Sequence, residues 1–255
     1  MDLRVIGCHG GETPKHRTSA FTLDDRLAID AGSLTSGMDL KAQCALKACL
    51  VSHAHLDHIR DLATIADNRA QNGCAPLVIA GTKQTIDILK KHFFNGLLWP
   101  DFTKIPSARK PTIEYLPLKP ETKTKIAGYT VRAILVSHTI ECCAFVIEGK
   151  DGAIAYSGDT GPTKRMWEVL NDVPNLRAML MEVSFPDSEQ KVATLSGHHT
   201  PQTLGPELMK YKNPKDLPTL LYHIKPVFQG RVEREVAKIK GVNLTVLNLG
   251  DHFIL

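Results

Sequence analysis

The segment Ala48-Cys49-Leu50-Val51-Ser52-His53-Ala54-His55-Leu56-Asp57-His58 places three histidines and one aspartate within six residues. Its first four residues are apolar, which is typical of a buried strand. His53 and His55 are two residues apart, so an extended chain points both side chains to the same side. Asp57 and His58 follow after a turn and can face a second ion. Imidazoles with a carboxylate suit zinc, iron or manganese rather than calcium or magnesium. The segment therefore predicts a metal site at a strand end.

Three later segments each place one more donor at the end of an apolar run. The first run ends before His138, the second before Asp159 in a Gly-Asp-Thr-Gly turn, and the third before His223. Taken singly, each has an ordinary alternative, because a strand-terminal histidine is usually a satisfied polar residue and Asp-Gly sequences favour turns. One turn cannot supply about seven ligands, so we interpret the three segments together as the rest of the metal site.

Two further segments suggest a proton-transfer pair. Glu182 interrupts the apolar strand-like segment Leu180–Pro186, and His198 precedes a helix for which Thr200 is the expected N-cap and Pro201 the first residue. A carboxylate beside an imidazole orients the ring and stabilises its protonated form. We therefore predict His198 as a general acid supported by Glu182. The alternative is that Glu182 is a surface residue on a strand.

The ordered donors resemble those of the metallo-β-lactamase-fold hydrolases, and the resemblance covers the whole chain. It begins with Val5–Gly11 and Leu27–Gly32, which are similar to that family's opening strand, glycine loop and strand-Asp-x-Gly segment. The resemblance implies an α/β (α+β) fold, a four-layer αββα sandwich, as a single domain over residues 1–255. It also implies two divalent metal ions, zinc first, with manganese or iron as alternatives. By this resemblance, one ion is held by His53, His55 and His138, the other by Asp57, His58 and His223, and Asp159 bridges both.

Five segments in order resemble the class II cyclic-nucleotide phosphodiesterases: His53–His58, Phe94–Pro100, Glu182–Phe185, Gly197–Pro201 and His223–Pro226. This resemblance implies hydrolysis of 3′,5′-cyclic nucleotides (cAMP or cGMP) to nucleoside 5′-monophosphates by a metal-bridging hydroxide, with His198 protonating the leaving 3′-oxygen. One departure is Arg60-Asp61, where family members often carry a small residue. That departure touches no ligand but puts the rim of the pocket in doubt.

The segment 93–111 has a weak pattern and predicts an insertion loop, and long loops inside compact domains are usually functional. Phe93, Phe94 or Trp99 could stack on the base, the alternative being that these rings fill the core beneath the loop. The substrate-binding residues that we predict are Phe94, Asn95, Trp99, His199 and Thr200.

Other hydrolases of this fold compete with the phosphodiesterase hypothesis. A tRNA 3′-end-processing endonuclease (ribonuclease Z-like) also uses a Glu and a His beyond the metal ligands, but the chain has no long Gly/Pro/Lys-rich arm. A β-lactamase or lactonase would leave Glu182 and His198 unexplained. A flavodiiron oxygen reductase would carry a carboxylate in place of His55 and a flavin domain. A binding module that had lost catalysis would have lost ligands. We rank the nuclease second.

The chain of 255 residues, 43% hydrophobic and 23% charged, has the composition of a globular protein. Helical patterns cover Ile59–Ala70 and Thr82–His92. The net charge of +4 favours an anionic substrate such as a phosphate. Lysines gather at Lys119–Lys125, which we interpret as a solvated hairpin rather than a nucleic-acid patch.

No run of 18 apolar residues and no signal-like N-terminal segment is present, so we predict a cytoplasmic protein. The six cysteines lack C-x-x-C spacing and mostly lie in apolar runs, which favours buried, reduced thiols. The adjacent Cys142 and Cys143 would point to opposite faces of a strand and make a poor disulfide pair. We expect a small-molecule cyclic nucleotide as partner, no membrane and no stable nucleic-acid complex, and we leave a homodimer open.

Overall fold

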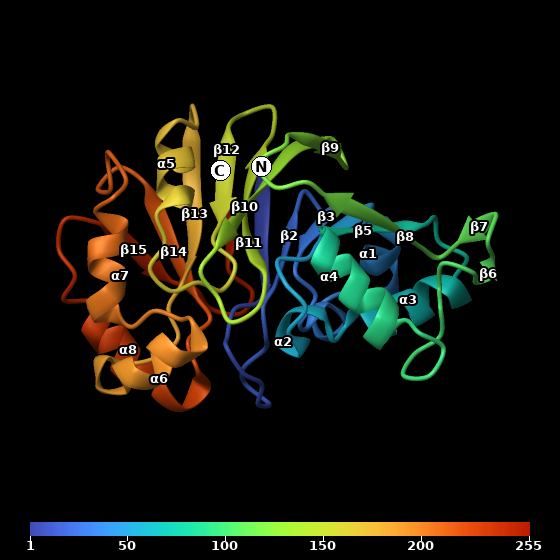
Figure 1. Ribbon diagram of the computed structural model, residues 1–255, viewed down its shortest axis with the longest axis horizontal. Helices are drawn as coiled ribbons and strands as arrows, with labels where there is room; N and C mark the ends of the chain where they lie inside the picture. The colour runs from blue at the N-terminus through green and yellow to red at the C-terminus, as the bar shows by residue number, and fades with distance from the viewer.

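Two seven-stranded sheets form the centre of the molecule in the computed structural model, which describes residues 1–255 (Figure 1). The first sheet has the strand order β16-β1-β2-β3-β4-β5-β8. Its strands are β1 (Asp2–Gly7), β2 (Ala20–Leu23), β3 (Leu27–Ile29), β4 (Ala48–Leu50), β5 (Leu77–Thr82), β8 (Ile113–Leu118) and β16 (His252–Ile254).

The second sheet has the order β15-β14-β13-β12-β11-β10-β9. Its strands are β9 (Thr124–Ile126), β10 (Tyr129–Val136), β11 (Cys142–Glu148), β12 (Ala153–Tyr156), β13 (Leu176–Glu182), β14 (Pro218–Tyr222) and β15 (Asn243–Val246). A separate two-stranded sheet pairs β6 (Pro106–Ser107) with β7 (Lys110–Pro111).

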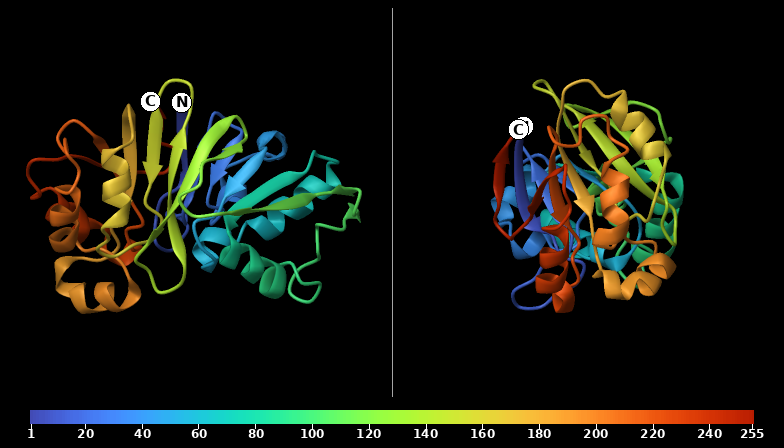
Figure 2. Two further views of the ribbon diagram at one scale, coloured as in Figure 1. Left: turned by 45° about the horizontal axis from the view of Figure 1, so that its top comes forward. Right: turned by 90° about the vertical axis from the view of Figure 1, so that its left-hand side faces the viewer.

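Helices cover the outer face of each sheet, as the two views of Figure 2 show. On the side of the first sheet these are α1 (Leu40–Ala45), α2 (Leu56–Ile59), α3 (Leu62–Gln71) and α4 (Lys83–Ile88), with a π-helical turn at Leu89–Phe93. On the side of the second sheet they are α5 (Arg165–Asn171), α6 (Gln190–Ser196), α7 (Pro201–Leu208) and α8 (Gln229–Val236). Short 3₁₀ turns occur at Leu34–Ser36, Asp187–Glu189 and Pro226–Phe228. None of the helices is long and apolar enough to cross a membrane.

Three hydrophobic clusters hold these layers together. The inner cluster lies between the sheets, where Phe21 of β2 packs against Tyr156 of β12 and Tyr222 of β14, with ring centroids 5.8 and 5.5 Å apart. Along β13 the side chains alternate, because Leu180 joins the inner cluster while Met179 joins the cluster under the helices. Both faces of each sheet are therefore buried, and the predicted αββα sandwich is confirmed.

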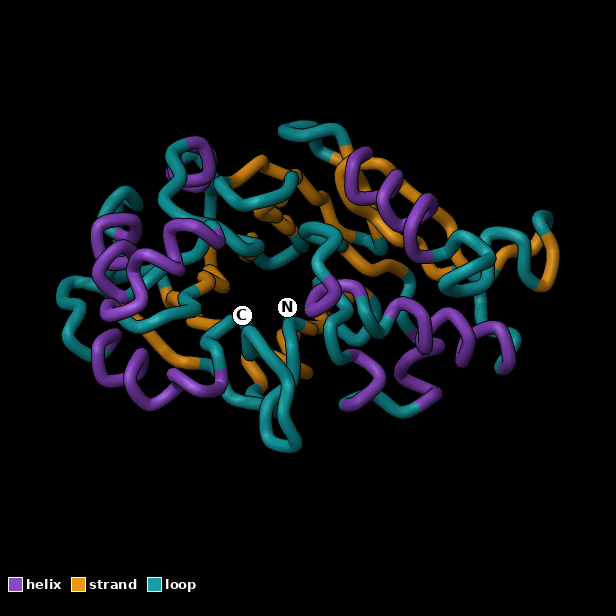
Figure 3. Tube along the Cα trace, turned by 60° about the horizontal axis from the view of Figure 1, so that its bottom comes forward, coloured by secondary structure: helices purple, strands orange, loops and turns teal.

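The carboxyl ends of several parallel strands meet at one edge of the sandwich. β12, β13 and β14 pair in parallel, and β10 runs in the same direction because it is antiparallel to β11, which is antiparallel to β12. β4 ends at the same edge from the first sheet. Figure 3 looks onto this edge, where loops from both halves surround the centre. In α/β folds such an edge is the usual place of a ligand site.

Two sequence predictions of local structure need correction. The Lys119–Lys125 segment is not a hairpin, because β8 belongs to the first sheet and β9 to the second, so most of the segment forms the connection between them. The predicted insertion 93–111 begins inside a helix, since Phe93 is the last residue of the π-helical turn, and β6 and β7 form its far end.

The cysteines are only in part as predicted. Cys142 and Cys143 are buried and free on opposite faces of β11, as are Cys8 and Cys49 elsewhere in the fold. Cys44 and Cys74, however, form a disulfide that links the end of α1 to the loop after α3. Sequence spacing missed this pair because the two residues are 30 positions apart and are brought together only by helix packing. The cytoplasmic location stays a prediction.

Candidate metal centre and active site

Every predicted metal ligand lies in one cluster at the carboxyl edge of the two sheets. His53 and His55 follow β4, Asp57 and His58 lie in α2, and the remaining three follow β10, β12 and β14. Within the cluster, three donor atoms at a time lie within 4.8 Å of one another. Three of these groups use only the predicted ligands: His53, His55 and His138; His53, His58 and Asp159; and Asp57, His58 and His223.

The first group has the spacing of ligands on a single ion. The Nε2 atom of His53 lies 3.0 Å from Nδ1 of His55, and that atom lies 3.2 Å from Nε2 of His138. Nitrogen ligands placed about 2.0–2.1 Å from zinc in a tetrahedral arrangement lie about 3.3 Å from each other. These three nitrogens can therefore share one ion.

The second group has similar spacing and is joined to the first through Asp159. The Nε2 atoms of His58 and His223 lie 3.3 Å apart, and His223 Nε2 lies 3.3 Å from Oδ2 of Asp57. Oδ2 of Asp159 lies 3.2 Å from each of these two Nε2 atoms and 3.8 Å from Nε2 of His53. Asp159 thus stands between the two groups, where a bridging ligand would be.

The residues fit a metal on electrostatic grounds as well. The other oxygen of Asp159, Oδ1, is buried and has no hydrogen-bond partner, which is costly for a carboxylate unless an ion binds it. Burial alone would lower the pKa of His58, but Asp159 and Asp30 raise it well above its ordinary value. The two carboxylates therefore favour a positive charge at this position.

The remaining imidazoles of the cluster are held in the form that binds metals. Burial is the largest cause of a lowered pKa for His53, His55, His138 and His223. These rings are neutral near pH 7 and keep a lone pair for coordination. Burial would also raise the pKa of Asp159, but His223 and His58 beside it lower that pKa well below its ordinary value, so the carboxylate is ionised.

Asp30 orients ligands of both groups, a role that the sequence did not reveal. Its carboxylate accepts hydrogen bonds from Nδ1 of His58 at 2.7 Å, from the Ser52 hydroxyl and backbone N–H at 2.8 Å each, and from the Tyr156 hydroxyl at 2.6 Å. Because the Ser52 hydroxyl donates to Asp30, its oxygen can accept from Nδ1 of His53, 3.0 Å away. With Nδ1 of His53 and of His58 held in this way, both imidazoles point Nε2 toward the cluster. Hydrogen bonds to the second ring nitrogen usually orient metal-binding histidines in this manner.

Glu182 and Ser184 play the corresponding part in the second sheet. The Ser184 hydroxyl donates to Oε2 of Glu182 at 2.9 Å, so its oxygen can accept from Nδ1 of His223, also 2.9 Å away. This fixes Nε2 of His223 as the ligand atom. His138 is fixed more simply, because its Nδ1 lies 3.0 Å from the carbonyl oxygen of Gly197.

Two of these residues have backbone conformations that side chains rarely adopt. Asp30, just after β3, has φ +54°, and His223, just after β14, has φ +73°. For residues other than glycine such values cost free energy and cluster at functional sites. Here they turn a carboxylate and an imidazole sharply from a strand end into the cluster.

The predicted acid, His198, lies at the border of the metal cluster. A ligand atom of its ring lies within 4.8 Å of one from His138 and one from Asp159, and the ring stacks on that of His223, with centroids 5.1 Å apart. Its Nδ1 lies 3.2 Å from Oγ of Ser184 and 3.4 Å from Oε1 of Glu182. Glu182 and His198 are therefore brought together, with Ser184 as an additional partner that was not predicted.

Several predicted substrate-binding residues are covered by protein and cannot contact a substrate. Phe94 is 2% exposed and belongs to the hydrophobic cluster under α3 and α4, so it fills the core beneath the loop. Phe93 lies in the same cluster. Asn95 is half-buried and caps the following turn through its side chain; Trp99 is exposed, and its indole donates to the carbonyl oxygen of Ala63 in α3.

His199 and Thr200 lie at the start of α7 and are covered by protein in this structure. Both are fully buried; His199 Nδ1 lies 3.0 Å from the Thr203 hydroxyl, and the Thr200 hydroxyl donates to the Gln190 side chain. Thr200 is the N-cap of α7 and Pro201 its first residue, as predicted. The His-Thr-Pro sequence therefore starts a helix that positions His198.

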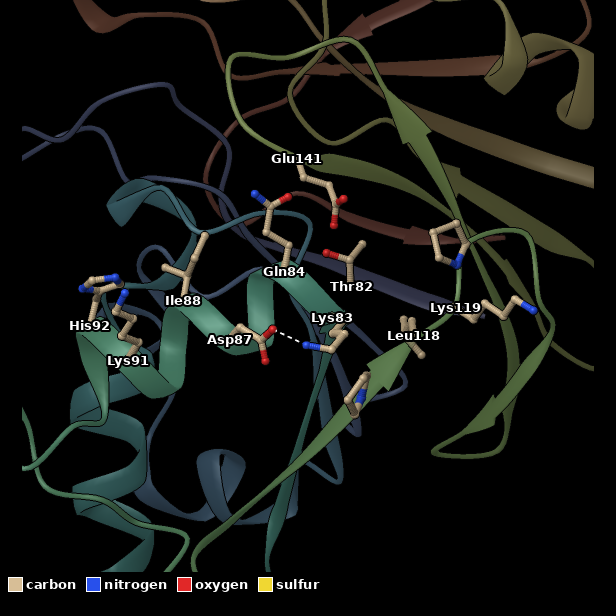
Figure 4. Close-up of a pocket in the computed structure, with 12 residues that line it drawn as sticks. Thr82, Lys83, Gln84, Asp87, Ile88, Lys91, His92, Leu118, Lys119 and Glu141 are labelled. Atoms are coloured by element: carbon tan, nitrogen blue, oxygen red, sulfur yellow. Dashed lines mark hydrogen bonds and ion pairs between the residues drawn. The ribbon is translucent and has the colours of Figure 1, made fainter.

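A hollow of about 730 Å³ lies beside α4, where Figure 4 draws its lining residues. We call it the α4 cavity. Lys83, Lys91, Asp87 and Gln84 form much of its wall, and an ion pair joins Lys83 to Asp87. A smaller hollow, about 480 Å³, shares Gln84 and Glu141 with it and includes the ligand His138.

The sequence matches a known family over well more than half its length. A profile described as "Beta-lactamase superfamily domain" covers residues 33–212, which include His53 to His58, His138, Asp159 and His198. The chain belongs to the β-lactamase superfamily. The predicted metallo-β-lactamase-fold hydrolase is confirmed at this level.

Among similar proteins, a 3′,5′-cyclic-nucleotide phosphodiesterase of Aliivibrio fischeri is 29% identical over 303 residues, covering 100% of this chain and 90% of that protein. A probable 3′,5′-cyclic-nucleotide phosphodiesterase of Yersinia pestis is 28% identical over 280 residues, covering 90% and 79%. A ribonuclease Z of Borrelia garinii subsp. bavariensis is 31% identical over 170 residues but covers only 59% and 49%. The crystal structure of unliganded yeast PDE1 superposes with a TM-score of 0.84 at 20% identity, covering 100% and 99%, which supports the shared fold.

Proposed function

We propose that this protein is a binuclear-metal phosphodiesterase that hydrolyses 3′,5′-cyclic nucleotides, cAMP or cGMP, to nucleoside 5′-monophosphates. The observation that carries the proposal is the pair of three-donor groups that meet at Asp159, with His198 at their border. Relatives with this activity in their names align over 90% and 100% of the chain, which supports the same substrate class.

His53, His55 and His138 would hold one divalent ion, Asp57, His58 and His223 the other, and Asp159 would contact both. Zinc suits these nitrogen and carboxylate donors, and manganese or iron are alternatives. Bound ions in such a site neutralise charge on a phosphate and activate water for attack at neutral pH.

The protein's own contribution to the reaction is the proton that the leaving 3′-oxygen needs. Nδ1 of His198 faces Ser184 and Glu182, so Nε2 is the atom left to face a substrate. When hydroxide, formed by loss of a proton from water to solvent, attacks phosphorus and the bond from phosphorus to the 3′-oxygen breaks, Nε2–H would donate its proton to that oxygen. Burial lowers the pKa of His198, and Glu182 in its ionised form would offset this by favouring the imidazolium, as an orienting carboxylate does in other His-carboxylate pairs.

A second candidate is the tRNA 3′-end-processing endonuclease. The partial match to ribonuclease Z favours it, and that enzyme also acts on a phosphodiester. We rank it second because the ribonuclease Z sequence match covers 59% of this chain, whereas two of the phosphodiesterase matches cover 90% and 100% of it.

The test is an assay of the purified protein, loaded with zinc or manganese, on cAMP, cGMP and precursor tRNA. We expect release of the 5′-monophosphate from at least one cyclic nucleotide. Cleavage of precursor tRNA with no turnover of either cyclic nucleotide would contradict the proposal and favour the nuclease.

A further inference from the structure

We propose that the nucleobase of the substrate binds in a cavity on the side of the site opposite α4, stacked against the accessible ring faces of Phe185 and Phe228. This inference rests on the proposed function. The cavity has a volume of about 680 Å³, within the usual range for small-molecule sites. We call it the Phe185 cavity; its walls are the loop from Gly10 to His16, Phe185, and the segment from Lys225 to Phe228.

Two wall residues of this cavity lie against the predicted acid and one predicted metal ligand. The Phe185 ring lies 5.8 Å from the His198 ring, centroid to centroid. Gly10, in the opposite wall, lies so close to His223 that a Cβ there would be 2.3 Å from the His223 carbonyl oxygen and 3.0 Å from its Nδ1. Only glycine, which has no Cβ, allows the backbone at residue 10 to approach His223 so closely. The wall of the cavity at Gly10 is therefore in contact with the predicted metal ligand His223.

The chemistry of a cyclic phosphate directs the nucleoside toward this side. The 3′- and 5′-oxygens belong to one ribose, so the ribose lies on the side of phosphorus from which the 3′-oxygen leaves. Because His198 protonates that oxygen in the proposed mechanism, the ribose must border His198. Phe185 is the aromatic side chain that contacts His198, and the base would extend from the ribose across it.

The walls of the Phe185 cavity suit a flat base. The Phe185 and Phe228 rings are 6.0 Å apart at an interplanar angle of 54°, and both are half-buried, so part of each ring face remains accessible. Val227 is 83% exposed at the same segment. Aromatic faces and apolar edges of this kind bind bases by stacking.

The polar groups around the cavity are already paired with each other. Glu12 forms an ion pair with Arg60, the residue in which this chain departs from the family pattern. His16 bonds to Thr13 and Gln229, and the Lys225 ammonium donates to the Gly10 carbonyl oxygen. Stacking rather than hydrogen bonding to base edges should therefore dominate, and its loss should affect cAMP and cGMP similarly.

The α4 cavity is larger but less suited to a base. No phenylalanine, tyrosine or tryptophan lines it or the smaller hollow beside His138, so neither offers a ring face for a base to stack on. Figure 4 shows Glu141 close to Gln84, at the end opposite Lys91 and His92. This cavity supplies a matched control for the test.

The experiment compares Phe228→Ala with the wild-type protein and with Ile88→Ala, an apolar truncation in the α4 cavity. It measures KM for cAMP and cGMP, and the inhibition constants of AMP and of inorganic phosphate, which has no base. We expect Phe228→Ala to raise KM and the AMP inhibition constant about 5- to 100-fold, the range for losing one base stack. The phosphate constant and the bound metal should not change, and Ile88→Ala should resemble wild type.

If Phe228→Ala is poorly folded by circular dichroism, Phe228→Leu replaces it, because leucine keeps most of the volume and loses the ring face. An unchanged KM and AMP constant in a folded, metal-loaded variant overturns this inference while the proposed function stands. A higher KM in Ile88→Ala alone places the base in the α4 cavity and also overturns it. A wild-type protein that hydrolyses neither cyclic nucleotide overturns the proposed function, and this inference with it.

Discussion

Asp30 and Glu182 are both fully buried carboxylates behind the metal cluster, one from each sheet, but their surroundings differ. Asp30 accepts four hydrogen bonds of 2.6–2.8 Å and braces ligands of both donor groups. Glu182 accepts from the His199 backbone and the Ser184 hydroxyl at 2.9 Å each, and His198 lies 3.4 Å away. Burial raises the pKa of Glu182 to about 7.

The difference suggests that Asp30 mainly supports metal binding, whereas Glu182 also supports proton transfer by His198. Asp30, which follows β3 of the first sheet, binds Ser52, Tyr156 of the second sheet and the predicted ligand His58, and Ser52 in turn contacts the predicted ligand His53. The second sheet supplies a network that Ser184 divides between a ligand, His223, and the predicted proton donor, His198. Substitutions near Asp30 should therefore weaken metal binding. Substitutions near Glu182 should instead slow proton transfer to the leaving group.

Outside the seven predicted metal ligands, the largest effect should come from His198→Ala. We expect both ions to remain bound but turnover of cAMP to fall roughly 10²–10⁴-fold, the usual range for a general acid. The loss should shrink for bis-p-nitrophenyl phosphate, because p-nitrophenolate leaves without a proton. Steady-state kinetics on both substrates, with metal analysis of the variant, make the measurement.

An equal loss on the two substrates would mean that His198 binds the phosphate instead. Loss of metal in the same variant would mean that the two halves are not divided in this way, and that His198 supports the ligands directly.

Asp30→Asn should have the next largest effect, and on metal rather than on the proton. The amide keeps the size of the side chain but removes the charge that favours a cation at His58. Outer partners of metal ligands typically contribute 10–100-fold to affinity or activity. We expect metal affinity to fall about 10–100-fold, with activity restored by excess metal. An inactive variant that still holds both ions at wild-type affinity would contradict this role.

Ser184→Ala should have a smaller effect that touches both networks. It removes the acceptor for Nδ1 of His223 and the link from Glu182 to His198, but leaves the first donor group intact. We expect one ion to bind more weakly, about tenfold or less, while the other is unaffected. Stepwise metal titration followed by calorimetry should resolve this, and equal weakening of both ions would refute it.

The smallest effect on catalysis should come from Phe94→Leu, which lies outside both networks. Since Phe94 packs in the core under the helices, the change should lower the melting temperature through a stability loss of about 1.5 kcal/mol or less. Kinetic constants of the metal-loaded variant should match wild type. A higher KM without loss of stability would restore the original prediction that Phe94 binds substrate.

The fold and the clustering of the seven candidate ligands could be predicted because the candidates follow only four strands, β4, β10, β12 and β14, and strand ends are visible as short apolar runs before a polar residue. Glu182 and His198 could be paired because a carboxylate at a strand end and a histidine before a helix N-cap are both visible in the sequence. The role of Asp30 could not, because its partners Ser52, His58 and Tyr156 lie 22, 28 and 126 positions away. Only the tertiary fold brings them together.

The substrate pocket was predicted poorly because aromatic and polar residues in a motif can serve the fold as well as a ligand. Phe94 looks the same in sequence whether its ring faces a base or the core, and burial alone decides between them. Thr200 likewise shows helix-capping character in sequence, but nothing there reveals that its hydroxyl is fully enclosed. Phe228, which lines the Phe185 cavity, carries no signal of its own in the sequence.

The most direct test of the account is to count metal ions and identify the product in the same sample. We predict two divalent ions per chain in fully active protein and release of the nucleoside 5′-monophosphate from a cyclic nucleotide. Asp159→Ala, which removes the shared carboxylate, should lose both ions and the activity together. Full activity with one ion or none, or a 3′-monophosphate as product, would contradict the two-ion phosphodiesterase proposed for this site.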